Sequence, residues 1–215
     1  MNSYTEGIRL SAEHTDSPAL MADLFRNRSR TGLSLHFYDD ARSDALRSSS
    51  LLPSTSDRAA GLNSKALFRA ATAAYHLGDY EGGRSILGQL RELTPDDESA
   101  AILGKRIRLR LREQARGNYN FDHIRKCAES SGNVDVASFL LRTEVCAVPI
   151  NGMGLFATQD VKAGDIVFCE KAFVAATLQD GQTMPAHLIT TRNGQVGMSR
   201  TYDVALWKNV VDKVT

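Results

Sequence analysis

Apolar and small residues in the first half of the chain recur every three or four positions, which predicts helices with one apolar face. Moving residues 25–53 forward by 42 positions (67 − 25) places them on residues 67–95, where small residues meet small ones and proline meets proline. The matched pairs are Phe25 and Leu67, Ser29 and Ala71, Gly32 and Ala74, Tyr38 and Tyr80, Ala41 and Gly83, Ala45 and Leu87, Ser48 and Leu90, and Pro53 and Pro95. This agreement predicts a helical repeat domain.

Each repeated unit is predicted to contain two antiparallel helices. The sequence LGDY at Leu77–Tyr80 supplies a glycine turn between them, and Pro95 would end the second helix. Before the first unit, NSYTEGIRLSAEH predicts one more helix, the second helix of an earlier unit. After Pro95, DDESAAILGKRIRLRLREQAR predicts a capping helix with acidic residues at its start. The alternation in RIRLRLR would also allow a strand, but the length of the segment favours a helix.

These units resemble the tetratricopeptide repeat, a helix pair with a period of about 34 residues. The longer spacing here is assigned to extra residues at Ser54–Gly61. The resemblance implies an α-helical domain over residues 1–128. It also implies a groove in which stacked units bind a protein or an extended peptide.

One subset of these repeats, found in co-factors of heat-shock chaperones, holds acidic C-terminal peptides in a carboxylate clamp. The resemblance assigns peptide-binding roles to Asn27 in LFRNRS and to Lys65 and Arg69 in SKALFRAA. An ammonium and a guanidinium group one helical turn apart can converge on a carboxylate with an amide beside them. Chaperone C-terminal peptides are therefore expected as partners. The same residues are common at solvent-facing positions of such repeats, and that alternative stays open.

The pattern changes after the polar segment ESSGNVDVAS at Glu129–Ser138. TEVCAVP at Thr143–Pro149 alternates and is rich in β-branched residues, and LFAT and DIVFCEKAFVAA are short apolar runs separated by turn sequences. These features predict a meander of short strands. The expected fold class is therefore α+β, with a helical repeat domain over residues 1–128, a linker over 129–140 and a β-rich part over 141–215.

The string NGMGLFATQDVKAGD is similar to the first motif of SET-domain protein-lysine methyltransferases. In that family, glycines without a Cβ let the backbone lie against S-adenosylmethionine. The resemblance assigns Gly152, Met153 and Gly154 to this cofactor. A plain hairpin turn at Asn151 and Gly152 is the alternative explanation for the first glycine. The order of the two parts also fits, because a group of SET proteins familiar from fungi carries tetratricopeptide repeats ahead of the SET domain.

The later motifs of that family are missing from the sequence. GNYNF at Gly117–Phe121 stands where the fungal group has a similar segment, but no Asn-His pair occurs in the 215 residues. The last tyrosine, Tyr202, lies beside a helical stripe formed by Trp207, Val210, Val211 and Val214. We therefore interpret the chain as truncated at both ends relative to that family and inactive as an enzyme on its own, with no catalytic residue assigned. The alternative function is a peptide-binding adaptor.

Composition narrows the function classes further. The 26 basic and 25 acidic residues leave a net charge of +1, which gives no reason to expect nucleic acid or an anionic membrane. The basic run in residues 105–116 is interpreted as a solvated helix face, because no aromatic residues interleave for base stacking. Cys127, Cys146 and Cys169 have no zinc-ligand spacing, and their odd number favours the reducing nucleus or cytoplasm. No membrane span and no metal site are expected.

Overall fold

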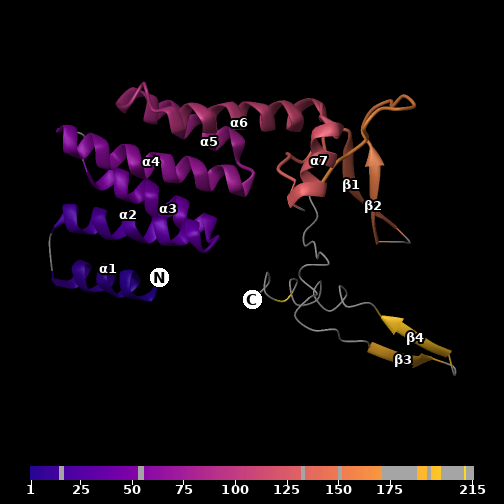
Figure 1. The fold of residues 1–215 in the computed structure, drawn as a ribbon, viewed down its shortest axis with the longest axis horizontal. Coiled ribbons are helices and arrows are strands. Elements are labelled where there is room, and N and C mark those ends of the chain that lie inside the picture. The colour runs from indigo at the N-terminus through magenta and orange to yellow at the C-terminus, as the bar shows by residue number, and fades with distance from the viewer. Residues whose placement is uncertain are drawn as a thin grey trace. The chain divides into compact units, whose positions relative to one another are not determined.

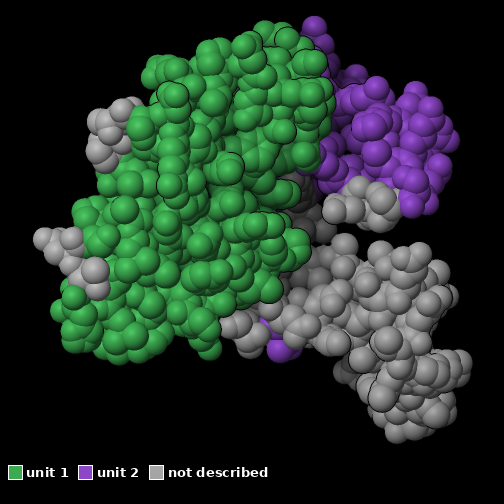
Figure 2. All heavy atoms as spheres, turned by 60° about the vertical axis from the view of Figure 1, so that its left-hand side comes forward, with its two compact units in different colours: residues 1–117 green, residues 118–215 purple. Residues whose placement is uncertain are grey.

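The fold is known from a computed structural model. It describes residues 1–14, 17–52, 56–131, 134–149, 152–170, 188–192, 195–199 and 211. Contacts divide the chain into two compact units, Met1–Gly117 and Asn118–Thr215, called here the helical unit and the C-terminal unit (Figure 2). The boundaries predicted at residues 128 and 140 stay predictions.

The helical unit is a stack of six helices in its described residues (Figure 1). They are α1 (Asn2–His14), α2 (Pro18–Ser34), α3 (Tyr38–Leu51), α4 (Asp57–Leu77), α5 (Tyr80–Leu93) and α6 (Glu98–Arg116). Each helix packs on the next one in the chain, and α4 also contacts α2 and α6. Helices α2, α4 and α6 therefore form one layer, and α3 and α5 pack against it from a second layer. This confirms the helical, repeat-like first part of the expected fold.

Local sequence fixes the turn between α4 and α5, which was predicted from LGDY. Gly78 follows the last residue of α4 with a φ of 79°, a left-handed conformation that glycine adopts without a steric penalty. Asp79 then caps the start of α5, because its side chain accepts a hydrogen bond from the main-chain nitrogen of Gly82 at 2.9 Å. The chain thus reverses direction within two residues.

The core of the helical unit combines buried alanines with large aliphatic and aromatic side chains. Leu90 and Ile107 are at most 1% exposed. A Cβ built on Gly83 would lie 3.0 Å from Cδ1 of Ile107, so the missing side chain lets α5 approach α6 closely. The fully buried alanines are Ala22, Ala41, Ala45, Ala66, Ala70, Ala71, Ala73 and Ala74. The matched repeat positions are buried, with three exceptions. Tyr38 is half-buried, Pro95 is exposed, and Pro53 lies outside the described residues.

Polar contacts also tie α2 to α3. The guanidinium group of Arg28 donates two hydrogen bonds to the carboxylate of Asp44, both at 2.7 Å. The hydroxyl of Ser48 donates to the main-chain oxygen of Ala22 at 2.7 Å. Asp44 and Ser48 are both buried, so these bonds satisfy polar groups that water cannot reach.

The C-terminal unit combines one helix with two hairpins in its described part. Its elements are α7 (Phe121–Ser131), β1 (Thr143–Val148), β2 (Gly152–Ala157), β3 (Leu188–Arg192) and β4 (Gln195–Ser199). Strand β1 pairs antiparallel with β2, placing Cys146 opposite Gly154, and β3 pairs antiparallel with β4. The strands predicted from TEVCAVP and LFAT are thus present. Within residues 165–170 the structure shows one isolated bridge, from Cys169 to Phe139.

Part of the predicted C-terminal structure cannot be compared with the described residues. Tyr202 and the predicted stripe after it lie outside the described residues, apart from Val211. The described strands do not by themselves show a SET domain, so that part of the expected fold stays a proposal. Among the helices described, none has the length and apolarity needed to cross a membrane.

Candidate functional site

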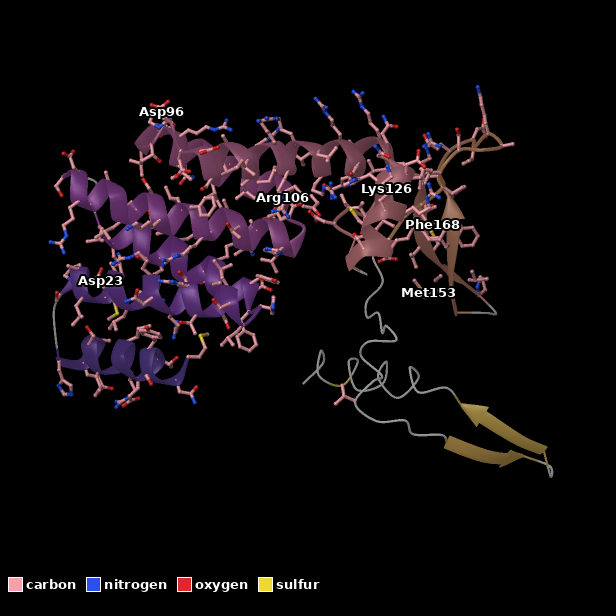
Figure 3. All side chains as sticks on the ribbon, viewed as in Figure 1. Asp23, Asp96, Arg106, Lys126, Met153 and Phe168 are labelled. Carbon is pink, nitrogen blue, oxygen red and sulfur yellow. The ribbon has the colours of Figure 1, made fainter. Side chains whose placement is uncertain are left out.

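Charged and polar side chains gather where α2 and α4 contact each other. On α2 they follow one face, because they recur at helical spacings of three and four residues. On α4, Lys65 and Arg69 lie one turn apart. Nη1 of Arg69 donates to the main-chain oxygen of Arg26 at 2.5 Å, which joins the two helices. The α2–α4 surface is defined as Asp23 (labelled in Figure 3), Arg26, Asn27, Arg30, Lys65 and Arg69.

The three residues predicted to bind a peptide all belong to this surface. Asn27 is exposed on α2, Lys65 is exposed on α4, and Arg69 is half-buried between them. The bond from Arg69 ends on Arg26, the residue just before Asn27. The fold therefore brings Arg69 to the helical turn that carries Asn27. Whether they bind a peptide stays a prediction.

The α2–α4 surface is positively charged. It carries four cationic side chains and one carboxylate, Asp23, which forms an ion pair with Arg26. Burial lowers the pKa of the Arg69 guanidinium, and the neighbouring charges of Arg30 and Arg26 lower that pKa further. Arginine starts from so high a pKa that Arg69 stays charged. The result is a set of like charges that an anion would stabilise.

Sequence reasoning missed Arg26 and Arg30. A signal was present, because both flank Asn27 at helical spacing within LFRNRSR. What the sequence did not show is that this turn of α2 lies next to Arg69 of α4. The hydrogen bond from Arg69 to the main chain of Arg26 shows that the cationic side chains of α2 and those of α4 form one surface.

A recess of about 490 Å³ opens beside Lys65 and Arg69. Its walls include Phe68 from α4 and Asp97, whose side chain caps the start of α6 by accepting from the main-chain nitrogen of Ala100 at 2.9 Å. Phe68 gives the recess an apolar wall next to the two cations. The recess can therefore take an apolar group whose neighbour on the same ligand is an anion.

The residues assigned to S-adenosylmethionine lie on β2. Gly152 has a φ of 82°, and a Cβ built there would meet nothing within 4 Å, so its backbone is open to a ligand. At Gly154 the added Cβ would lie 2.8 Å from Cε2 of Phe156 and 3.0 Å from Cγ2 of Val148. Met153 is exposed. A cofactor could therefore lie against the backbone of Gly152. At Gly154 the Phe156 ring already occupies the corresponding space.

The positive φ of Gly152 has a structural explanation within the hairpin, because it follows the turn between β1 and β2. Asn151 lies outside the described residues. The side chains described contain no group of three or more His, Cys, Asp or Glu that could hold a metal ion.

Comparison with known proteins finds two kinds of relative. The chain is 36% identical over 120 residues to a protein named "Methyltransferase" from Gibberella zeae, a match that covers 55% of this chain and 16% of that protein. It is 30% identical over 124 residues to protein unc-45 homolog B of Homo sapiens, which covers 56% of this chain and 12% of that protein. The Mus musculus protein of the same name matches at 30% identity over 123 residues. No family model matches, and no solved structure matches significantly.

The chain therefore spans no more than 16% of the length of these relatives. It shares sequence with part of a fungal protein that carries the name methyltransferase and with part of unc-45 homolog B.

Proposed function

We propose that the helical unit binds a protein partner by holding the C-terminal carboxylate of a peptide on the α2–α4 surface. The observation that carries this proposal is the pairing of Lys65 and Arg69 one turn apart on α4, with Arg69 joined to α2 beside Asn27. The surface has excess positive charge, and the adjoining recess has an apolar wall. An acidic C-terminal peptide, such as those of chaperones, would supply matching groups.

Each of the three residues has a distinct task in this proposal. Lys65 supplies an exposed ammonium charge. Arg69 uses one N–H for the oxygen of Arg26, and a guanidinium group has about four further N–H donors for a carboxylate. Asn27 adds an amide donor. A few charge-assisted hydrogen bonds correspond to an affinity in the high-micromolar range.

Calorimetry on the full chain tests this proposal. The ligand is a short acidic peptide with a free C-terminus, and its matched control is the same peptide with a C-terminal amide. We expect the free acid to bind and the amide to lose at least about tenfold in affinity, because the amide removes the charge that Lys65 and Arg69 would hold.

Protein variants sharpen this test. Lys65→Ala and Arg69→Ala should both weaken binding of the free acid. Arg84→Ala is the matched control, because Arg84 lies on α5 and pairs with Glu81 away from the α2–α4 surface. Equal heats for the free acid and the amide, or for all four proteins, would overturn the proposal.

A second candidate is membership in the SET-domain protein-lysine methyltransferases, favoured by the relative named "Methyltransferase". The open backbone at Gly152 supports S-adenosylmethionine as the cofactor of that function. The cofactor would supply the methyl group. This chain contains no Asn-His pair, so we propose that it does not transfer methyl groups by itself. We propose a location in the nucleus or cytoplasm, because the odd number of cysteines favours a reducing compartment.

Labelled S-adenosylmethionine, incubated with the full chain and a protein extract, tests this second candidate. We expect no label above a blank without enzyme. Labelling that saturates with cofactor and disappears in Gly154→Trp would show that the chain is active alone and that the interpretation of its C-terminal part is wrong.

A further inference from the structure

The α2–α4 surface has more cationic groups than one peptide carboxylate needs. Arg26 is 9% exposed, and its Nη2 donates to Asp23. Its Nη1 is buried and has no hydrogen-bond partner within the described part of the chain. A buried charged donor without an acceptor is costly, so an acceptor supplied by a ligand would be stabilising.

Arg30 lies on the same face of α2, one turn beyond Arg26. The structure shows no acceptor for its side chain among the described residues, and its charge lowers the pKa of Arg69. Three guanidinium groups thus lie within reach of one another's charge, and Asp23 neutralises one of them. About two positive charges remain without a counter-ion among these residues.

We propose that Arg26, Arg30 and Arg69 form a binding site for a doubly charged phosphate group, either a phosphate monoester or inorganic phosphate. A phosphoryl group carries close to two negative charges at neutral pH and has three strong acceptor oxygens. Planar guanidinium groups match it with paired N–H donors. A second carboxylate would bring one charge and two oxygens, leaving part of the cluster unsatisfied.

The chemistry fits two sources, a phosphorylated residue of a bound peptide and free phosphate. The peptide source rests on the proposed function, since it needs a peptide on the α2–α4 surface. A phosphorylated residue near the acidic C-terminus would then place its phosphate on Arg26 and Arg30 while Lys65 holds the carboxylate. Arg69 would donate to both groups, because its guanidinium has several N–H donors beyond the one used for Arg26. Phosphorylation of the partner would strengthen the complex.

The experiment compares three probes on the full chain by calorimetry. They are inorganic phosphate, an acidic C-terminal peptide with one phosphoserine, and the same peptide with serine. We expect the phosphopeptide to bind about tenfold or more tightly than the serine peptide, because the phosphate adds one to three charge-assisted hydrogen bonds. Inorganic phosphate should bind weakly and compete with the phosphopeptide.

Two variants locate the effect. Arg30→Gln removes a charge from an exposed position and should reduce the gain from phosphorylation to less than about twofold. Arg26→Lys keeps a charge but removes the planar donor group, and it should reduce the gain as well. Arg84→Ala is the control and should keep the full gain.

The pH dependence gives an independent readout. The second pKa of a phosphate monoester is about 6, so the dianion prevails above that pH and the monoanion below it. The gain from phosphorylation should therefore fall as the pH decreases from about 7 to about 5. A carboxylate contact would hardly change over this interval, because carboxyl groups titrate near a pH of about 4.

The outcomes separate this inference from the proposed function. If free-acid and amidated peptides bind equally, the carboxylate proposal fails, while binding of inorganic phosphate that is lost in Arg30→Gln still supports the phosphate site. Binding of phosphate without any gain for the phosphopeptide supports free phosphate as the source. No binding of phosphate and no gain from phosphorylation, or a full gain in Arg30→Gln, would overturn the phosphate site.

Discussion

The helical unit and the β1–β2 hairpin differ in how far their apolar side chains are buried. In the helical unit, Leu90 is fully buried and Ile107 is 1% exposed. In the hairpin, Val145 is 64% exposed and Met153, which Figure 3 labels, is 66% exposed. The buried apolar residues in the described part of the C-terminal unit are Ala137 and Phe139.

The difference follows from how each kind of element completes a core. A helix in a repeat buries its apolar face on the next helix along the chain, so the layer closes with local contacts. Two strands form one layer, and a second layer has to cover their apolar side chains. The helical unit should therefore carry its own stability, whereas the hairpin should contribute little in the described arrangement.

The largest expected effect is in the helical core. Leu90→Ala should lower the free energy of unfolding by about 2–5 kcal/mol, because it removes buried methyl groups and leaves a cavity. Urea unfolding followed by circular dichroism measures this change. The control is Leu109→Ala, since Leu109 is 46% exposed on α6. An equally small effect of both substitutions would show that the buried core does not provide the stability of the helical unit, and the contrast with the hairpin would be wrong.

A smaller loss is expected at the contact between α2 and α3. Asp44→Asn removes the charge that accepts two hydrogen bonds from Arg28, and we expect a loss of about 1.5–3 kcal/mol in the same unfolding experiment. Asp39→Asn is the control, because the Asp39 side chain is 79% exposed and lies 3.5 Å from Arg42. Losses of the same size in both variants would contradict a special role of the buried pair.

Two glycines of α5 should respond with opposite signs. Gly83→Leu should destabilise the unit by about 1–3 kcal/mol, since its first side-chain atom already lies 3.0 Å from Ile107. Gly88→Leu should stabilise it by up to about 1 kcal/mol, because nothing lies within 4 Å of that Cβ and leucine favours the helix. Melting temperatures of the two variants give the signs. A stabilising Gly83→Leu would show that α5 and α6 pack less closely than described.

The smallest effect is expected in the hairpin. Val145→Thr should change the free energy of unfolding by no more than about 0.5 kcal/mol, as is usual for exposed positions. The substitution keeps the β-branched shape that strands favour. A loss above about 2 kcal/mol would mean that another surface covers this face in solution.

The repeats were the part of the fold most accessible from the sequence. The 42-residue shift matched small residues to small ones, and positions such as Ala41 and Gly83 are buried because helices pack there. The hairpin followed from alternation in Thr143–Val148. The peptide-binding residues came from the resemblance alone. The contribution of Arg26 and Arg30 needed the contact between α2 and α4, which residues 43 positions apart in the chain (69 − 26) make.

The fully buried alanines constrain how the helical unit can change by mutation. Eight alanines on α2, α3 and α4 have no exposed surface, and five of them lie on α4. Almost every single substitution at such a position adds volume, so only glycine and serine are small enough to be tried, and glycine weakens a helix. In a saturation library, α4 should therefore be the segment of the helical unit with the fewest tolerated amino acids. The solvent-facing positions of α6 should accept the widest range.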